Sequence, residues 1–390
     1  MASFWSHFQQ WMLVHILIMY VFVTSGLIIN FLQLCACIIW PFSRTINRRI
    51  NRILLYNIWS QVTFLGQWWS RSDCRVCLYD AADIKYINNE HAITVMNHSY
   101  DIEWLMGWII CERIGLLTGT KVYGKSVLKY LPILGWSWAL SENIFLERDW
   151  AKDKATIAND VKKLAEYPPG MNVWYLLFCE GTRFTEKKHI LSNEVARKKG
   201  LPELKYHLLP RTKGFALSVR EMKGIVPAVY DIEICFCDNG IKPTLSNILN
   251  GKRFQAELHM RRFALDDIPS DEEGCSKWLY KMYQEKDELF GYFKENGKFP
   301  GYRLDLKRRP FDLICFCFWT IITCVPLFYY IGGMLLYGSI FVRLTILFGL
   351  IFISLVGHLL ILMTEADKGS SYGAKGNVDN GAEEDKRKVQ

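Results

Sequence analysis

A histidine and a carboxylate stand five residues apart, at His98 and Glu103, where an apolar stretch gives way to a helical pattern. On a single helix, five residues would turn the two side chains about 140° apart. If His98 instead lies in the loop before the helix, Glu103 can reach back to the imidazole. A carboxylate that fixes the tautomer of a histidine allows that histidine to act as a general base. A histidine near acidic residues is, however, more often an ordinary polar surface residue.

A second stretch, Glu180-Gly181-Thr182-Arg183, also follows an apolar run. A glycine allows the backbone to approach a ligand closely, and the planar guanidinium of Arg183 can grip a phosphate through paired N–H groups. A β-turn that ends in a solvated arginine would give the same residues. Neither stretch is specific by itself.

Together, the two stretches resemble the first and third motifs of the glycerolipid acyltransferase superfamily, which are a His-x4-Asp after Asn and a Glu-Gly-Thr-Arg. The segment from Lys125 to Arg148 resembles the second motif, and Val226–Tyr230 resembles the fourth, a hydrophobic strand with a proline. Leu209–Phe215 is similar to a segment of the animal 1-acyl-glycerol-3-phosphate acyltransferases. All four motifs occur in the family's order across residues 97–230, which is far more specific than any one of them.

The resemblance implies that a fatty acyl group passes from acyl-CoA to the sn-2 hydroxyl of a lysophospholipid, foremost lysophosphatidic acid. His98 would take the hydroxyl proton, and Glu103 would orient the ring and stabilise the imidazolium. No Gly-x-Ser-x-Gly occurs, so transfer is expected without an acyl-enzyme. Acyl-CoA is a co-substrate, and no cofactor, metal or nucleic-acid partner is implied. By the same resemblance, substrate binding is assigned to Asn97, Lys125, Arg148, Glu180, Gly181, Thr182, Arg183 and Pro227.

One position departs from the family's pattern, because Glu103 stands where the family has Asp. A shift of about 1 Å in a catalytic group can cost on the order of a hundredfold in rate. Asp101 is an alternative orienter, although its spacing from His98 differs. Two other functions therefore stay open. One is acylation of another lysophospholipid such as lysophosphatidylinositol, and the other is a catalytically inactive membrane scaffold.

Strand-like and helical patterns alternate between residues 44 and 310, which predicts an α/β domain. The resemblance implies a mixed central sheet flanked by helices. Predicted strands, rich in Val, Ile and aromatic residues, are Ala92–Met96, Val173–Phe178, Ile225–Phe236 and Phe254–Met260. Predicted helices are Ile102–Ile114, Asp153–Glu166 and Asp271–Asn296.

Charge is distributed unevenly over the 390 residues, which rules out a fully soluble protein. Residues 1–43 hold no Asp, Glu, Lys or Arg, and residues 310–364 hold only Asp312 and Arg343. Crossing a bilayer takes about 20 apolar residues. The pattern therefore predicts an N-terminal transmembrane anchor within residues 1–43 and a transmembrane hairpin at 311–364. A cleaved signal peptide would need a basic start and a shorter apolar core.

Basic clusters predict the orientation in the lipid bilayer. Arg44, Arg48, Arg49 and Arg52 follow the first span, and Arg303, Lys307, Arg308 and Arg309 precede the second. Residues 44–310 are therefore expected to be cytosolic, with a lumenal N-terminus and a disordered cytosolic tail at 365–390. Lys386 and Lys388 in that tail resemble a dilysine retrieval signal, which predicts the endoplasmic reticulum membrane. The net charge of +8 suits a domain that meets anionic headgroups or anionic substrates.

Overall fold

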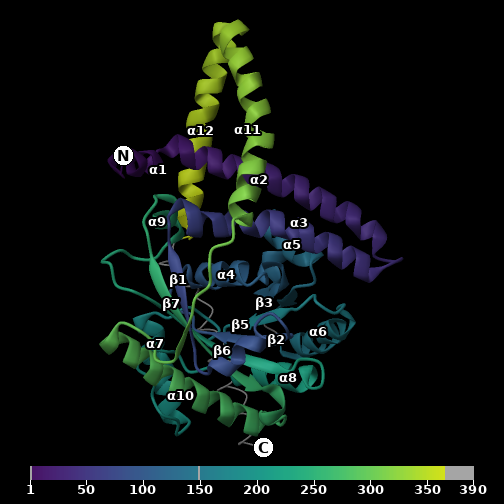
Figure 1. Ribbon diagram of the computed structural model, residues 1–390, viewed down its shortest axis with the longest axis vertical. Coiled ribbons are helices and arrows are strands. Elements are labelled where there is room, and N and C mark those ends of the chain that lie inside the picture. The colour runs from purple at the N-terminus through teal and green to yellow at the C-terminus, as the bar shows by residue number, and fades with distance from the viewer. Residues whose placement is uncertain (1, 148–149, 365–390) are drawn as a thin grey trace, which may run out of the picture.

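The computed structural model describes residues 2–147 and 150–364 of the chain. Arg148 and the expected tail at 365–390 lie outside these described residues. Within them, eight strands form one mixed sheet in the order β4-β3-β5-β2-β6-β7-β1-β8 (Figure 1). The strands are β1 (Asp73–Leu78), β2 (Ala92–Met96), β3 (Thr120–Lys125), β4 (Ile144–Leu146), β5 (Trp174–Leu177), β6 (Ala228–Phe236), β7 (Gln255–Ala264) and β8 (Tyr302–Leu304).

Five neighbouring strands of the sheet, from β4 to β6, run parallel to one another. β7 is antiparallel to β6 and parallel to β1, and β8 closes the edge antiparallel to β1. Parallel strands end at the same edge of a sheet, so the segments that follow β2 and β5 come together there. These two segments contain His98 and Glu180.

Helices cover both faces of the sheet (Figure 1). On one face, α4 (Glu103–Arg113) packs through Leu105, Met106 and Ile109, which are fully buried at helical spacing, and α3 (Arg44–Phe64) covers it. The opposite face is covered by α6 (Trp150–Lys162), α8 (Thr212–Met222) and α10 (Glu272–Asn296). The other helices are α1 (Ala2–Gln10), α2 (Met12–Ala36), α5 (Leu134–Leu140), α7 (Glu186–Lys198), α9 (Leu245–Leu249), α11 (Phe311–Tyr337) and α12 (Ile340–Thr364). Short helical turns lie at Cys37–Ile39, Leu65–Trp69, Ala81–Tyr86, Leu117–Gly119, Ser126–Tyr130, Lys163–Glu166 and Leu265–Asp267.

The α/β architecture expected from the sequence is confirmed, with shifts at some element ends. β2 has the expected bounds, whereas β6 begins at Ala228, later than predicted. Pro227 lacks a backbone N–H, and Gly224 turns the chain with a φ of 81° just before it. β7 runs on to Ala264 because it pairs with the whole length of β6.

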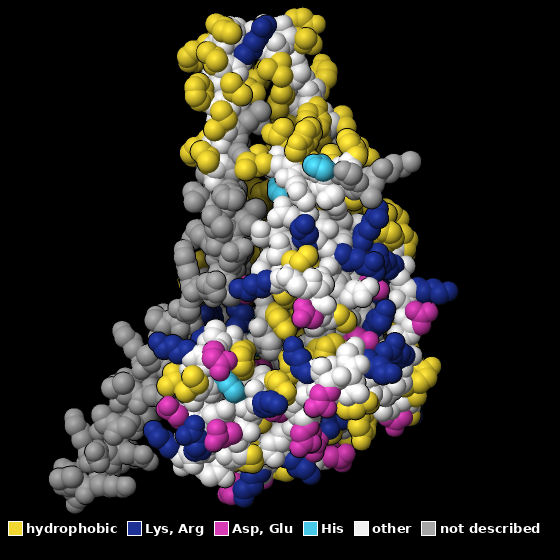
Figure 2. Space-filling model, turned by 90° about the vertical axis from the view of Figure 1, so that its left-hand side faces the viewer, with side chains coloured by type: hydrophobic (Ala, Val, Ile, Leu, Met, Phe, Trp, Pro, Cys, Tyr) yellow, Lys and Arg dark blue, Asp and Glu magenta, His cyan; other side chains and the backbone are white. Residues whose placement is uncertain are grey.

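Two helices of the described residues are long and apolar enough to cross a membrane, Met12–Ile39 and Phe311–Tyr337. They coincide with the expected anchor and with the first arm of the expected hairpin. α11 turns at Gly338 into α12, and the two helices rise together from the domain (Figure 1). Hydrophobic side chains cover the visible face of this hairpin, whereas charges of both signs cover the domain below it (Figure 2).

The N-terminal apolar helix α2 lies beside α3, at a steep angle to the α11–α12 hairpin (Figure 1). Two of its polar side chains are bonded to α3. Gln61 donates to Oγ of Ser25 at 2.9 Å, and Gln33 donates to Oδ1 of Asn51 at 3.1 Å. Because polar groups in apolar surroundings need such partners, α2 is held as part of the folded domain and not as a detached anchor.

Candidate active site

His98 and Glu103 meet where β2 ends and α4 begins. His98 lies in the loop after β2, and Glu103 is the first residue of α4. Nδ1 of His98 is hydrogen-bonded to Oε1 of Glu103, whose side chain is fully buried, and the other carboxylate oxygen accepts the backbone N–H of Tyr100. The glutamate, one methylene longer than the aspartate of the family's motif, thus still bonds the ring. Nε2 of His98 is left as the ring nitrogen that can accept a proton.

The surroundings of His98 favour the neutral ring. The imidazole stacks on Phe178 with 4.2 Å between ring centroids, and 21% of its side chain is exposed. Burial, together with the cations of Arg183 and Lys188, lowers the pKa of His98 to about 3. Burial also raises the pKa of Glu103 well above its usual range, against the backbone N–H groups that bond it. Burial thus disfavours a charge on each of the two groups.

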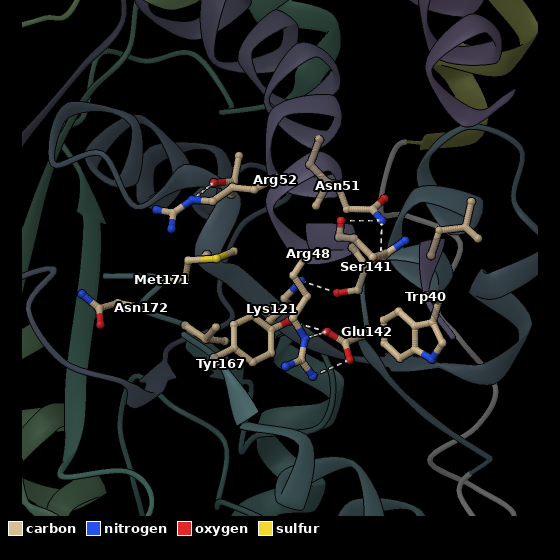
Figure 3. Close-up of a pocket in the computed structure, with 16 residues that line it drawn as sticks. Trp40, Arg48, Asn51, Arg52, Lys121, Ser141, Glu142, Tyr167, Met171 and Asn172 are labelled. Carbon is tan, nitrogen blue, oxygen red and sulfur yellow. Dashed lines mark hydrogen bonds and ion pairs between the residues drawn. The ribbon is translucent and has the colours of Figure 1, made fainter. Parts of the chain in front are cut away.

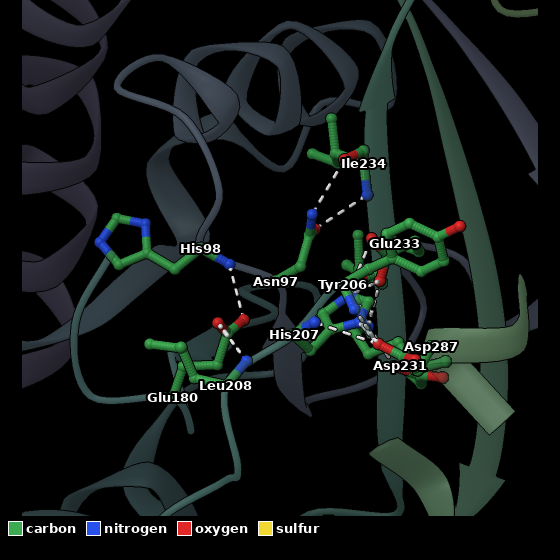
Figure 4. Close-up of polar contacts among 12 residues, drawn as sticks. Asn97, His98, Glu180, Tyr206, His207, Leu208, Asp231, Glu233, Ile234 and Asp287 are labelled. Carbon is green, nitrogen blue, oxygen red and sulfur yellow. Dashed lines mark hydrogen bonds and ion pairs between the residues drawn. The ribbon is translucent and has the colours of Figure 1, made fainter. Parts of the chain in front are cut away.

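Glu180, in the turn that follows β5, ties the two motif-bearing loops together. Its side chain is buried, with Oε1 accepting the backbone N–H of His98 at 2.9 Å and Oε2 accepting that of Leu208 at 3.3 Å (Figure 4). A third backbone bond, from the N–H of Phe184 to the carbonyl of His98, measures 2.8 Å. The position of the histidine is thus set by the Glu-Gly-Thr-Arg segment.

A buried cluster of charges lies behind Glu180 (Figure 4). The ring of His207 contacts Asp287 at 2.9 Å and Glu233 at 3.2 Å, and the ammonium of Lys286 contacts Glu233 at 3.2 Å and Asp231 at 2.6 Å. Burial disfavours a charge on His207, but the two carboxylates outweigh it and raise its pKa to about 10. Burial raises the pKa of Glu180, and the cation of His207 together with the two backbone N–H groups opposes that rise.

Asn97 and Gly181 shape the backbone of the site. Asn97 is fully buried, and its side-chain amide exchanges two hydrogen bonds of 2.9 Å with the backbone of Ile234 on β6 (Figure 4). Both ends of this amide are committed to that clamp. Gly181 has a φ of 71°, and a Cβ there would lie 2.8 Å from the side chain of Arg211. Only glycine meets both conditions without strain.

Cationic side chains gather beside His98. Arg183 forms an ion pair with Asp101, and Lys188 donates to Oγ1 of Thr182 at 2.7 Å and to the Arg183 carbonyl at 3.2 Å. Burial, together with the charges of Arg183 and Lys125, lowers the pKa of Lys188. Asp101 is thus a partner of Arg183, and it is Glu103 that is hydrogen-bonded to the histidine ring.

The structure does not bring every predicted residue to this site. Pro227 is exposed at the beginning of β6, level with the beginning of β2, so it lies roughly 20 Å along the strands from His98. Arg148 is outside the described residues. Conversely, Lys188 and Arg211 were not predicted as site residues, although Arg211 lies within Leu209–Phe215 and Lys188 follows the Glu-Gly-Thr-Arg segment by five residues. His207 had no sequence signal, because its partners lie far away along the chain.

Two cavities in the described part of the chain lie elsewhere. The first, of about 20 Å³, surrounds the buried ion pair of Arg48 with Glu142, which also accepts the hydroxyl of Tyr167 at 2.7 Å (Figure 3). That volume holds about one water, so the cluster joins α3 to the sheet and is not a substrate site. The second cavity is lined in part by Glu112, near the opposite end of α4 from Glu103. Within the described residues, no group of His, Cys, Asp and Glu side chains could hold a metal ion.

A histidine with one free ring nitrogen next to gathered cations, on a mixed α/β sheet, is an arrangement suited to group transfer to a hydroxyl near an anionic group. Residues 79–234 match the family model described as Acyltransferase, and residues 247–319 match the model described as Acyltransferase C-terminus. The 1-acyl-sn-glycerol-3-phosphate acyltransferase gamma of Mus musculus is 46% identical over 361 residues, 92% of this chain and 95% of that protein. The delta protein of Homo sapiens is 44% identical over 362 residues, 93% of this chain and 94% of that protein. The chain belongs to the acyltransferase family.

Proposed function

We propose that the protein transfers a fatty acyl group from acyl-CoA to the sn-2 hydroxyl of lysophosphatidic acid and so forms phosphatidic acid. The observation that carries the proposal is the His98–Glu103 pair beside Arg183 and Lys188, with the charge of Lys125 acting on Lys188. A phosphate monoester brings up to two negative charges close to the hydroxyl that reacts. The names of the gamma and delta relatives support the same acceptor.

The chemistry needs no nucleophile on the chain. Nε2 of His98 takes the proton of the hydroxyl as its oxygen attacks the thioester carbonyl. Glu103 stabilises the imidazolium that forms. When the carbon–sulfur bond breaks, the same nitrogen returns the proton to the coenzyme A thiolate. The low pKa of His98 makes the imidazolium a stronger acid for this second step and the neutral ring a weaker base for the first, and the negative charge of Glu103 offsets that weakness.

Phosphate binding falls to the cations around the Glu-Gly-Thr-Arg segment. The ion pair with Asp101 holds the guanidinium of Arg183 in place, and 37% of that side chain stays exposed. A planar guanidinium offers several donors, so a phosphate can bind while Asp101 remains bound. Lys188 adds a second positive charge.

The same proposal places the protein in the endoplasmic reticulum membrane, with residues 44–310 on the cytosolic side. The Arg clusters that flank α2 and α11 support this orientation. Acyl-CoA is made of water-soluble coenzyme and apolar chain, so a cytosolic site at the bilayer surface suits it.

Thioester release by the purified protein tests the proposal. Lysophosphatidic acid, lysophosphatidylinositol and lysophosphatidylcholine are compared with one acyl-CoA, and His98→Ala is the control. We expect lysophosphatidic acid to react fastest and His98→Ala to lose at least about a hundredfold of the rate. Faster reaction of lysophosphatidylinositol would favour the alternative acceptor. A folded protein that uses none of the three would support the scaffold function.

A further inference from the structure

A second cavity lies between α3, the end of α4 and the segment that enters α11. Its volume of about 330 Å³ falls at the lower end of the range for ligand pockets, roughly 300–1,000 Å³. Arg52, Tyr56, Glu112 and Arg309 are among the residues that line it. Glu112 is nine residues along α4 from Glu103, or about 14 Å at the helical rise, so this cavity is separate from the active site.

The positive charges of this cavity are poorly compensated. Arg52 donates to neutral groups, the hydroxyl of Thr118 at 3.0 Å and the carbonyl of Gly170 at 3.2 Å, and no carboxylate of the described residues lies within ion-pair distance of it. Figure 3 shows Arg52 apart from the Arg48–Glu142 pair. Arg309 is 4.0 Å from its carboxylate partner. A partly buried guanidinium without a close counterion is costly, and an anion bound between the two would offset that cost.

The one carboxyl group in the cavity wall does little to neutralise these cations. Glu112 is buried, and its Oε1 accepts the hydroxyl of Tyr56 at 2.8 Å. Burial raises the pKa of Glu112 to about 7, so the group is only partly ionised at neutral pH. The cavity therefore keeps a net positive charge.

Apolar side chains extend from this cavity toward the hairpin. Ile53 in its wall is 67% exposed, and Phe311, Ile314 and Phe318 on α11 are each half exposed or more. The guanidinium of Arg309 lies 4.8 Å from the ring of Phe311. α11 leaves the domain beside α3 (Figure 1), and among the described residues it is one of two helices long and apolar enough to cross a membrane. A ligand here meets cations at one end and an apolar surface at the other.

We propose that this cavity binds the phosphate group of an anionic phospholipid of the bilayer. Arg52 and Arg309 contact the phosphate, and the acyl chains follow the exposed side chains of α11. A soluble phosphate could contact the same two arginines, but it would leave the apolar surface uncovered.

Native mass spectrometry of the full chain, released from nanodiscs of phosphatidylglycerol and phosphatidylcholine, tests this site. The parent should retain one bound phosphatidylglycerol. The double variant Arg52→Gln/Arg309→Gln should retain at least about tenfold less, because each hydrogen bond to a charged group is worth about that factor. Arg49→Gln is the matched control, since Arg49 is exposed on the same helix and does not line the cavity. Arg52→Lys keeps the charge and should bind better than Arg52→Gln.

Equal retention by the double variant and by Arg49→Gln would overturn the proposal. The proposal would also be overturned, in favour of a soluble anion, if millimolar glycerol 3-phosphate displaced the lipid from the parent to the same extent as the double variant loses the lipid. Unfolding midpoints in pure phosphatidylcholine nanodiscs show whether the variants fold. If the double variant does not, Arg309→Gln alone and the comparison of Arg52→Lys with Arg52→Gln decide the question in the same way.

Discussion

Glu103 bonds the ring of His98 although the family's motif has the shorter aspartate at that place. If this carboxylate stabilises the imidazolium, Glu103→Gln should lower kcat by at least about a hundredfold, since the amide keeps the shape without the charge. Glu103→Asp should remain active. The measurement is kcat and KM with lysophosphatidic acid and one acyl-CoA.

Asp101→Asn is the control for that experiment. Asp101 contacts Arg183 and not the histidine, so its loss should raise KM for the phosphate-bearing acceptor more than it lowers kcat. If Glu103→Gln keeps the parent's kcat while Asp101→Asn loses it, then Asp101 stabilises the imidazolium and Glu103 does not.

The cation of Lys188 acts on the titration of His98. It disfavours the imidazolium and so contributes to the lowered pKa of His98. Lys188→Met should raise that pKa, so that the acidic limb of the pH profile of kcat/KM moves to higher pH. Lys187→Met removes an exposed charge from the neighbouring position and should leave the limb in place. An acidic limb that stays in place, or moves down, in Lys188→Met would refute this coupling.

His207 links the buried charge cluster to stability. Its pKa is raised from 6.5 to about 10 in the folded protein, so the stability it contributes is complete below pH 6.5 and is lost as the pH rises through 10. His207→Gln should lower the unfolding midpoint at pH 7 and flatten its fall between pH 7 and 10. His189→Gln, at a histidine bonded to the Leu204 carbonyl, is the control and should keep the parent's slope. If the unfolding midpoint of His207→Gln still falls steeply between pH 7 and 10, groups other than His207 cause that fall.

Among the secondary-structure elements, the sequence pattern predicted those strands and helices whose apolar residues follow an unbroken local pattern. β2 was predicted with its bounds because five apolar or β-branched residues follow one another there, all buried on both faces. β1 was missed, since its pattern is broken by the exposed Arg75 and its main partner is β7, far along the chain. The same limit holds for the site. Motif residues such as His98 and Glu180 are readable, but the contacts that hold them come from tertiary packing.

The packing of α2 on α5 gives a prediction for these two elements. A Cβ on Gly26 would lie 2.5 Å from the side chain of Ile133, whose φ of 66° already strains a β-branched residue. Gly26→Ala should therefore destabilise the protein by about 1–3 kcal/mol through overpacking. Its unfolding midpoint in detergent is compared with that of Gly333→Ala on α11, where a Cβ meets nothing within 4 Å.

Ile133→Ala opens space opposite Gly26, so the two changes should couple. In a double-mutant cycle, Ile133→Ala should recover part of the loss caused by Gly26→Ala. Strict additivity would mean that α2 shifts away from α5 instead of pressing against Ile133.

For the whole molecule, the arrangement of the apolar helices decides which side of the membrane each segment faces. The Arg cluster at the beginning of α3 predicts that residue 200 is cytosolic and the N-terminus lumenal. α2 lies at a steep angle to the α11–α12 hairpin, however, and spanning helices tilt by up to about 40° from the bilayer normal. If α2 and the hairpin both cross the bilayer, each must tilt away from the bilayer normal by part of the angle between them.

Glycosylation tags and cysteine labelling in sealed membranes test this arrangement. A tag before residue 10 should report the lumen, and labels at residues 200 and 385 should report the cytosol. The label at residue 200 serves as the reference, because both basic clusters predict that residue 200 is on the cytosolic side of the membrane. A lumenal report from residue 200 would overturn the orientation altogether. A cytosolic N-terminus beside a cytosolic residue 200 would mean that α2 lies along the bilayer surface next to α3, with its exposed apolar face among the lipids and its polar side chains still paired with Gln61 and Asn51.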